Sequence, residues 1–317
     1  MDNITHSLAG ALIGQAGLKH KTGLAMPALI IGANLPDIDA ACFFWLDGHE
    51  HLGLRRGLTH GPLAMLLLPF ILACLLYSYD HWKARRDGKL NDRKSVNFKW
   101  LFLLSFIGCL SHPALDWLNI YGVRLLEPFS SKWFYGDTLF IIDVWLWGIM
   151  GLGLWLSLKK EKLGFSADNI ARLSLLFSVA YVSVNGAITN WDYKKYGSQF
   201  PNTAEYISSP VPLFFWRREQ VWGQDTVGWQ SRMVNYLSGR TEASFTPPMN
   251  TRLCEWPSEL ELGSGGVDAE AYLFWSRAPF AERAEDGSVL IKDARFYHPL
   301  VGDRFTLSLP SVTCEEP

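Results

Sequence analysis

The sequence predicts an α-helical integral membrane protein that carries a small extracytoplasmic β domain at its C-terminal end. The first observation is composition: 49% of the 317 residues are hydrophobic and only 19% are charged, whereas about 25% are charged in an average soluble domain. The second is that charge gathers in a few loops and in the last third of the chain. The third is a change of character near residue 190, so we expect a multi-helix transmembrane domain over 1–190 and an extracytoplasmic β-rich domain over 191–317.

The first predicted element is a helical hairpin. Apolar residues dominate 4–18 and a second segment that begins with 23–31 and runs to 34–39, and the basic residues Lys19 and Lys21 lie in the turn between the two segments. Helices of this length extend about 18–22 Å, which is shorter than the hydrocarbon core of about 30 Å. We therefore expect the hairpin to be re-entrant or to lie partly within the protein.

Four longer apolar runs follow, over 62–79, 98–120, 139–158 and 170–188, and they are predicted to cross the membrane. The loop between the first two, residues 80–99, carries seven Lys and Arg residues. Because cytoplasmic loops are enriched in these residues, this loop is predicted to be cytoplasmic. Counting the crossings from it places the region after residue 190 outside the cytoplasm.

The region beyond residue 190 predicts short strands, because aromatic and β-branched residues gather there in brief runs separated by turn residues. The five predicted strands are 213–222, 228–237, 271–278, 288–297 and 303–309. Cys254 and Cys314 lie in this region, and they can pair if it is outside the cytoplasm. The other three cysteines lie in or beside apolar runs and are interpreted as small hydrophobic residues.

The most informative stretch for chemistry is 111–117, where His112 and Asp116 lie four residues apart in an apolar run. Residues i and i+4 share one face of a helix, so the imidazole and the carboxylate can bind one metal ion. Ionisable residues within a membrane segment are costly and are commonly functional. The alternative is a hydrogen bond between the two side chains that pins a helix kinked by Pro113. The spacing alone leaves both interpretations open.

Further candidate ligands lie where the other apolar segments end. With His112 and Asp116, the set comprises His6, Asp37, Asp39, His60, Asp137 and Asp143. The predicted topology places all of them on the extracytoplasmic side, provided that the basic hairpin turn is cytoplasmic. Imidazoles and carboxylates without thiolates suit Zn²⁺, Mn²⁺ or Fe²⁺ in an open catalytic site.

Single members of this set have simpler explanations. His6 and Asp37 lie where helix caps would lie. Asp137 is best explained as a loop acid. Asp143 is harder to explain without a cation, because it lies within the apolar run 141–145.

The order of the motifs resembles one family. The motifs are Asn3-Ile4-Thr5-His6, Pro36-Asp37-Ile38-Asp39, Arg56-Gly57-Leu58-Thr59-His60, His112-Pro113-Ala114-Leu115-Asp116, 121–126, Pro128-Phe129-Ser130 and Ile142-Asp143. Over residues 1 to about 150 they resemble the bacterial membrane-bound metal-dependent hydrolases of the YdjM type, and 274–277 and 292–296 resemble the extracytoplasmic tail of that family. The family is itself distantly similar to zinc-dependent phospholipase C and the P1-type nucleases.

The resemblance implies a multi-pass protein of the bacterial inner membrane that carries a divalent-metal site. The metal positions that it implies are His6, Asp37, Asp39, His60, His112, Asp116 and Asp143. It implies zinc, in about one to three ions, with manganese or iron as alternatives, and phosphodiester chemistry. In one departure from the pattern, Arg55 stands where the family often has a histidine, so either that histidine is not essential or His51 supplies a ligand.

Two functions remain open at this point. The first is a phospholipase-like, metal-dependent hydrolase that uses a metal-activated water on a lipid or lipid-linked phosphoester at the extracytoplasmic membrane face. In this hypothesis Asp39 and Asp116 orient the water and Arg56 neutralises the phosphate, with Arg55 and Arg124 as alternatives. The second is a non-catalytic membrane protein that binds a metal or a lipid headgroup and presents the β domain to a partner. Nucleic acid is not expected as a partner, since no basic stripe with interleaved aromatic residues occurs.

Overall fold

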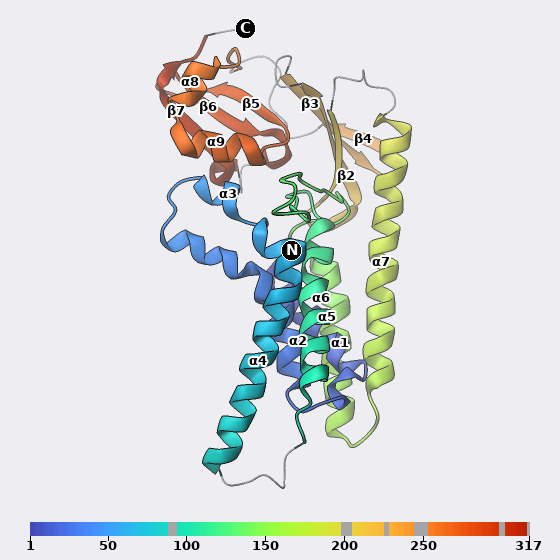
Figure 1. Ribbon diagram of the computed structural model, residues 1–317. Helices are drawn as coiled ribbons and strands as arrows, with labels where there is room; N and C mark the ends of the chain where they lie inside the picture. Colours follow the sequence, from blue (N-terminus) through green and yellow to red (C-terminus); the bar gives the residue numbers. More distant parts are fainter. Residues whose placement is uncertain (88–93, 198–204, 225–227, 244–252, 298–301, 316–317) are drawn as a thin grey trace. The chain divides into compact units, whose positions relative to one another are not determined.

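The computed structural model describes residues 1–87, 94–197, 205–224, 228–243, 253–297 and 302–315. These residues form two compact units. The first unit is Met1–Asp39 with Arg56–Asn185, and the second is Ala40–Arg55 with Gly186–Pro317 (Figure 1). The passage of residues 40–55 into the second unit was not predicted from the sequence.

The first unit is helical. Its elements are α1 (Asn3–Gln15), η1 (Leu18–His20), α2 (Ala25–Asn34), η2 (Leu35–Phe44), η3 (Leu58–His60), α4 (Pro62–Asp87), α5 (Phe98–Trp117), α6 (Val144–Lys162) and α7 (Asp168–Lys195), where η marks a 3-10 helix. The ends of η2 and α7 continue into the second unit. Within the first unit, α2 packs against both α1 and α5, and α4 runs alongside α5 (Figure 1).

Four helical segments are long and apolar enough to cross a membrane: Ala25–Phe44, Pro62–Arg86, Phe98–Trp117 and Asp168–Lys195. They confirm the predicted α-helical membrane protein. The second arm of the hairpin is longer than predicted, because α2 continues into η2 and the two together span 20 residues. Among the described residues, α6 is not one of these segments although a crossing was predicted there; its last turn carries Lys159, Lys160 and Lys162.

Glycines allow α1, α2 and α5 to pack closely. A Cβ atom at Gly10 of α1 would lie 2.7 Å from the carbonyl oxygen of Leu29 in α2, and one at Gly108 of α5 would lie 2.6 Å from the same oxygen. A Cβ atom at Gly32 of α2 would lie 2.7 Å from the carbonyl oxygen of Ser105 in α5. Small residues permit such close helix contacts in membrane bundles. The three helices are therefore held in a fixed register, which positions the polar residues at their ends.

The second unit contains two antiparallel sheets among its described residues. The first has the strand order β1-β2-β3-β4, with β1 (Glu205–Val211), β2 (Phe214–Gln224), β3 (Gly228–Asn235) and β4 (Arg240–Ala243). The second has the order β5-β6-β7, with β5 (Pro279–Arg283), β6 (Ser288–Asp293) and β7 (Thr306–Thr313). The unit also includes α3 (Glu50–Leu54), α8 (Glu259–Gly263), α9 (Gly266–Trp275), η5 (Ala294–Phe296) and η6 (Gly302–Phe305). The predicted C-terminal β-rich part is thus confirmed, although it also contains helices.

The predicted strands 213–222, 228–237, 288–297 and 303–309 overlap β2, β3, β6 and β7. The predicted strand 271–278 is wrong, because most of these residues belong to helix α9. The buried residues Ala269, Tyr272 and Trp275 recur every third position along α9. That spacing is the period of a helix face and not the alternation of a strand.

The two sheets share one hydrophobic core. Ile207, Val221 and Trp229 of the first sheet pack in the same cluster as Phe280 of the second. The indole N–H of Trp229 also donates a hydrogen bond to the carbonyl oxygen of Pro279 at 2.8 Å. The buried aromatic ring is therefore satisfied at its polar end as well.

Residues 40–55 join the second unit through α3 and α9. The backbone N–H of His49 donates to the carboxylate of Asp268, and Nδ1 of His49 lies 3.2 Å from the other oxygen of that carboxylate. A Cβ atom at Gly53 would lie 3.2 Å from Cβ of Ala271, so the two helices pack closely. This long-range contact explains why a segment between two membrane helices belongs to the C-terminal unit.

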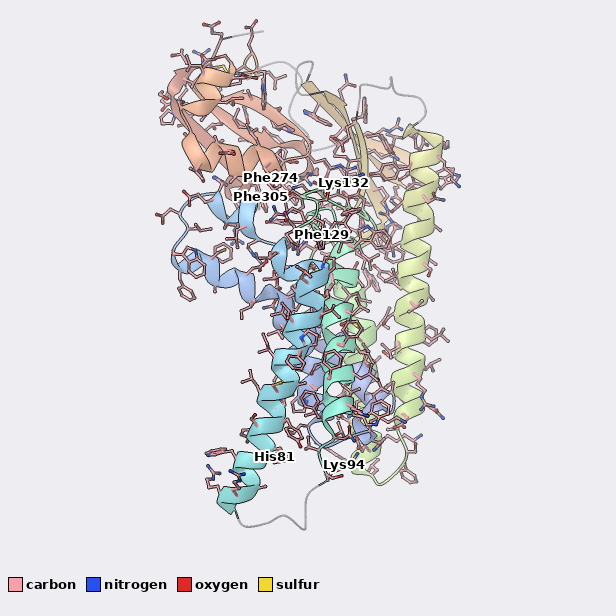
Figure 2. All side chains as sticks on the ribbon, in the orientation of Figure 1. His81, Lys94, Phe129, Lys132, Phe274 and Phe305 are labelled. Atoms are coloured by element: carbon pink, nitrogen blue, oxygen red, sulfur yellow. A yellow bond between two sulfur atoms is a disulfide. The ribbon has the colours of Figure 1, made fainter. Side chains whose placement is uncertain are left out.

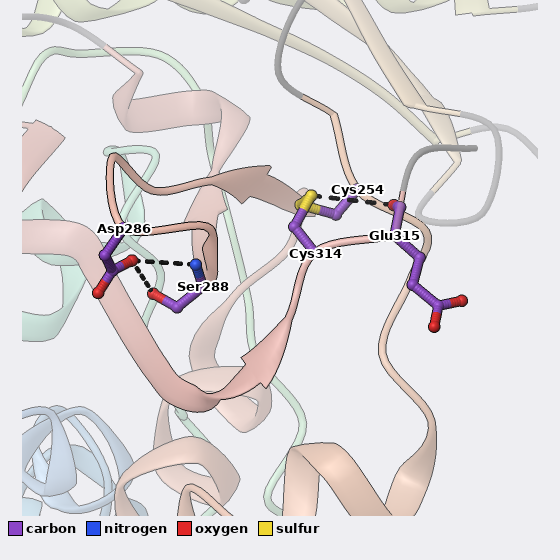
Figure 3. The surroundings of a disulfide bond; sticks show 5 residues. All are labelled: Cys254, Asp286, Ser288, Cys314 and Glu315. Atoms are coloured by element: carbon purple, nitrogen blue, oxygen red, sulfur yellow. Dashed lines mark hydrogen bonds between the residues drawn. A yellow bond between two sulfur atoms is a disulfide. The ribbon is translucent and has the colours of Figure 1, made fainter.

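A disulfide bond joins Cys254 to Cys314, which follows β7 (Figure 3). The two cysteines are 60 positions apart in the sequence. Beside the bond, the backbone N–H of Glu255 donates to the carbonyl oxygen of Glu315 at 2.8 Å. The pairing that the sequence left conditional is therefore present in the structure.

Candidate metal centre

Four side chains from three separate segments meet in the first unit. His112 and Asp116 lie in the last two turns of α5, His60 ends η3, and Asp37 lies in the first turn of η2. Each of the four residues offers one ligand atom, and these atoms lie within 4.8 Å of one another. The close packing of α2 against α5 brings the ends of these segments together.

The distances within this group suit ligands that share one ion. Nε2 of His60 lies 3.5 Å and Nε2 of His112 lies 3.6 Å from Oδ2 of Asp116. Nε2 of His112 lies 3.7 Å from Oδ1 of Asp37. Zinc–nitrogen bonds of about 2.0–2.1 Å in a tetrahedron place neighbouring ligand atoms about 3.4 Å apart. The observed separations are long for hydrogen bonds and close to the metal-site value.

The histidine nitrogens that face Asp116 make no hydrogen bonds within the described chain. Nε2 of His6, of His60 and of His112 is buried without a hydrogen-bond partner there. Leaving one buried polar atom unsatisfied costs about 1–3 kcal/mol, so a cluster of them needs an explanation. A bound cation supplies one, because the neutral imidazole nitrogen offers its lone pair to a metal.

Hydrogen bonds on the far side of two of the rings fix their tautomers. Nδ1 of His112 lies 2.7 Å from the carbonyl oxygen of Ala33, so this nitrogen carries the proton and Nε2 keeps the lone pair. Nδ1 of His60 lies 3.0 Å from Oγ1 of Thr59, and the Thr59 hydroxyl donates to Asp39 at 2.9 Å. Outer hydrogen bonds of this kind orient metal-binding histidines.

The environment of His60 also keeps the ring neutral. Burial lowers the pKa of His60 well below its ordinary value, and the neighbouring His112 and Arg56 side chains lower the pKa further. A histidine must be neutral to bind a metal ion. His60 therefore needs to lose no proton before it can act as a ligand.

His6 lies beside the other carboxylate oxygen of Asp116, Oδ1. Its ring stacks on that of His112 with 3.7 Å between the centroids, and its Nε2 lies 3.3 Å from Oδ1 of Asp116. The amino group of Met1 also contacts Oδ1 of Asp116. The fully buried carboxylate of Asp116 thus has His6 at one oxygen and the rings of His60 and His112 at the other.

Arg56 is a buried cation beside the group. Its Nε lies 3.1 Å from Oδ2 of Asp116. Its guanidinium donates to Oδ1 of Asn119 and to the carbonyl oxygen of Gly122, each at 3.2 Å. The guanidinium also lies over the ring of Tyr121, 4.5 Å from the centroid. These contacts hold one positive charge at the edge of the carboxylate.

Asp39 lies behind the group and supports it. Its Oδ2 accepts hydrogen bonds from the backbone N–H of Arg56 at 2.8 Å and from the hydroxyl of Thr59 at 2.9 Å. The same oxygen lies 3.7 Å from Nδ1 of His60, on the side of the ring opposite Asp116. Asp39, which was predicted as a metal position, is not a member of the group of four and contacts the far side of the His60 ring.

Asp143 and Asp137 are not members of the group of four. Asp143 is the N-cap of α6 and accepts hydrogen bonds from the backbone N–H groups of Trp145 and Leu146 and from the hydroxyl of Tyr181. Asp137 is buried and has a φ of 46°. The carboxylate of Asp143 thus caps a helix in the structure, and its role as a metal position stays a prediction.

The other predicted phosphate-binding or ligand residues have partners elsewhere. Arg55 and His51 belong to the second unit, where the Arg55 guanidinium lies 5.2 Å from the centroid of Phe43. Arg124 belongs to the first unit and pairs with Glu127 at 3.4 Å. Arg56 forms an ion pair with Asp116 of the group.

Asp143→Ala is expected to leave metal binding unchanged while it destabilises the chain by about 1 kcal/mol, because it removes the cap of α6. Metal content per folded chain and thermal unfolding, measured on the same preparation, check both parts. A variant that folds but has lost its metal would place Asp143 in the metal centre after all.

Thr59→Val is expected to weaken metal binding by about 10- to 100-fold. The change keeps the size of the side chain but removes the hydroxyl that connects Nδ1 of His60 with Asp39. Competition with a chelator of known affinity measures the effect. Thr59→Ser retains the hydroxyl and serves as the control; equal losses in the two variants would show that the hydrogen bond is not the cause.

Sequence reasoning did not identify the residues that hold the ligands in place. Thr59 belongs to the motif that ends at His60, and no motif includes Asn119. Asn119 follows Asp116 by three residues, and this spacing near a helix end was an available signal. Ala33 acts through its backbone carbonyl oxygen, for which no side-chain signal exists.

Comparisons with known proteins bear on the same part of the chain. A family model described as "YdjM inner membrane protein" matches residues 1–191. The protein "Uncharacterized protein YfhP" of Bacillus subtilis (strain 168) is 28% identical over 141 residues. This match covers 42% of the present chain and 39% of the relative, so the chain spans less than half the length of that relative. No solved structure matches the chain.

Proposed function

The chain belongs to the YdjM inner membrane protein family, and we propose that it is a metal-dependent hydrolase acting on a lipid or lipid-linked phosphoester at the extracytoplasmic face of the bacterial inner membrane. The observation that carries the proposal is the convergence of two histidines and two aspartates in one buried group. Unsatisfied imidazole nitrogens around a carboxylate are typical of metal sites, and they are costly in a purely structural cluster.

The donor set fits a divalent metal. Asp37, His60, His112 and Asp116 would hold one ion, and His6 offers a further nitrogen at the other oxygen of Asp116. Nitrogen and carboxylate donors suit zinc, with manganese or iron as alternatives, in about one to three ions. When bound, such an ion polarises a phosphoryl oxygen and lowers the pKa of a coordinated water.

Other residues of the chain would bind the phosphate and keep His60 available as a ligand. Arg56 keeps its charge under all physiological conditions, and guanidinium groups bind phosphate oxygens through paired hydrogen bonds. Asn119 and Gly122 hold this charge beside Asp116. Thr59 and Asp39 keep the proton of His60 on Nδ1, so that Nε2 stays available.

The membrane setting favours a lipid substrate. His60 lies just before the candidate span Pro62–Arg86, and Asp116 lies in the last turn of the candidate span Phe98–Trp117. Residues at the ends of membrane spans lie near the depth of the lipid headgroups. A phosphoester within or next to a headgroup would reach a site at this depth.

Purified full-length protein in detergent, assayed with bis(p-nitrophenyl) phosphate, tests the proposal. We expect release of nitrophenol that stops on chelation, returns with added zinc, and is lost in Asp116→Asn. A preparation that binds metal but hydrolyses neither this diester nor phospholipids would favour the other function, a non-catalytic protein that binds metal or a lipid headgroup and presents its β-sheet unit to a partner.

Two independent features support the orientation. The loop 80–99 carries seven basic residues, as cytoplasmic loops commonly do. The disulfide between Cys254 and Cys314 is of a kind that persists in oxidising compartments. We propose that residues 1–190 span the inner membrane and that 191–317 lie outside the cytoplasm.

A phosphatase-type reporter, which is active only outside the cytoplasm, is expected to be active when fused after Pro317. The same reporter inserted within 80–99 is expected to be silent, because the basic loop faces the cytoplasm. Activities are normalised to the amount of fusion protein. The reverse pattern would contradict both the orientation and the extracytoplasmic site.

A further inference from the structure

A recess lies in the first unit beside the C-terminal part of α4 and the residues that precede α5. It has a volume of about 270 Å³ and is lined by Leu24, Tyr79, Asp80, Lys83, Lys94 and Val96. Figure 2 shows Lys94 and His81 at this end of the helices, and Phe129 and Lys132, between α5 and α6, at the other. The metal centre lies at the C-terminal end of α5, so the recess is a separate feature.

The recess offers positive charge that is held in place. Its two lysines and one aspartate give the lining a net charge of +1. Nζ of Lys94 donates to the carbonyl oxygen of Lys19 at 3.3 Å. Nζ of Lys83 lies over the ring of Tyr79, 5.8 Å from its centroid. Two ammonium groups and a phenol hydroxyl are donors that suit a singly charged phosphate diester.

An exposed apolar stripe leads to the recess along α4. Ile71, Leu75 and Tyr79 follow one another at intervals of four residues, and their exposed fractions are 51%, 63% and 45%. Residues with this spacing lie on one face of the helix. Because α4 is a candidate membrane span that also exposes Leu66, Leu67 and Phe70, an acyl chain can lie along this face beside the recess.

We propose that this recess binds the phosphate of an anionic phospholipid, with one acyl chain lying along Ile71 and Leu75. The candidate spans Pro62–Arg86 and Phe98–Trp117 both have one end beside the recess, which places it near headgroup depth. Basic pockets between membrane helices bind anionic headgroups in this way. Pockets for drug-sized ligands measure about 300–1,000 Å³, so the recess accommodates the headgroup phosphate and not the whole lipid.

Native mass spectrometry of the full-length protein in a neutral detergent tests the proposal, with dioctanoyl phosphatidylglycerol as the anionic probe and dioctanoyl phosphatidylcholine as its zwitterionic counterpart, which has no net charge. We expect phosphatidylglycerol to bind and phosphatidylcholine to bind at least about tenfold more weakly. The variant Lys83→Gln/Lys94→Gln is expected to lose about 10- to 30-fold in affinity for phosphatidylglycerol, because each basic residue near a headgroup contributes about fivefold. Lys83→Arg/Lys94→Arg should retain the binding.

The control Lys160→Gln/Lys162→Gln removes the same charge from the end of α6 and is expected to bind like the parent. Thermal unfolding without lipid verifies that each variant is folded. If the double variant unfolds, Lys94→Gln alone replaces it, because Lys94 is exposed and lies outside the helices. This single variant is expected to lose about fivefold in affinity for phosphatidylglycerol. The proposal is overturned if the two lipids bind equally, or if binding is unchanged in the Lys83 and Lys94 variants. It is also overturned if the control loses as much affinity, or if an equal concentration of inorganic phosphate displaces the lipid.

Discussion

Asp116→Asn is expected to abolish tight metal binding, with a loss well above the roughly 100-fold that changes to outer hydrogen bonds can cause. The amide has the shape of the carboxylate but carries no charge. Asp116 is the residue that contacts His6 through one oxygen and the rings of His60 and His112 through the other. Removing its charge therefore weakens every part of the centre at once. Chelator competition on purified full-length protein measures the loss.

A matched control separates this effect from misfolding. Asp192 is equally buried but belongs to the second unit, where its carboxylate accepts hydrogen bonds from Ser208 at 2.5 Å and Gln220 at 3.2 Å. Asp192→Asn makes the same chemical change and is expected to alter stability but not metal affinity. If Asp116→Asn bound metal as tightly as the parent, a structural hydrogen-bonded pair with His112 would be the better explanation.

Replacing both Cys254 and Cys314 by Ser is expected to lower the free energy of unfolding of the second unit by about 4 kcal/mol. The bond closes a loop whose ends are 60 residues apart, and the chain entropy that a crosslink removes from the unfolded state grows with the logarithm of loop length. Proteolysis of the full chain at increasing urea concentration, followed by fragment size, reports the unfolding of this unit.

Cys74→Ser is the control for this experiment, because Cys74 is a half-buried free cysteine in α4 of the first unit. It is expected to leave the urea dependence of the second unit unchanged. A double variant as resistant as the parent would mean that the bond does not form in the cell. Such a result would also remove one of the two arguments for an extracytoplasmic C-terminal unit.

The site was predictable where its geometry is set by one helix. His112 and Asp116 were paired from their spacing alone, and their side chains lie 3.6 Å apart in the structure, since the helical repeat converts sequence spacing directly into position. Asp37 and His60 were placed on the same membrane face by topology. Their convergence on α5 depends on tertiary packing between helices, which no local pattern encodes.

Asp143 shows why a polar residue in an apolar run is ambiguous. Its role depends on whether a helix begins at the next residue, and α6 does begin at Val144. The run 141–145 contains no glycine or proline to mark that boundary. The sequence therefore does not distinguish a carboxylate that caps a helix from a buried carboxylate that binds a cation.

The sequence does not predict that residues 40–55 pack in the second unit, for a different reason. The contact that ties this segment to the second unit joins His49 to Asp268, which are 219 residues apart. The predicted strand 271–278 is wrong because its aromatic content favours a strand, whereas the recurrence of Ala269, Tyr272 and Trp275 at every third position is that of a helix face. Tertiary packing overrides intrinsic strand preference in such a segment.

The metal content of the purified chain tests the existence of the metal centre most directly. Full-length protein isolated without chelators and analysed by elemental mass spectrometry is expected to hold about one or more divalent ions per chain, as the buried group of histidine and aspartate donors predicts. A folded preparation that contains no stoichiometric metal, and that takes up none from added zinc, manganese or iron, would contradict the metal centre.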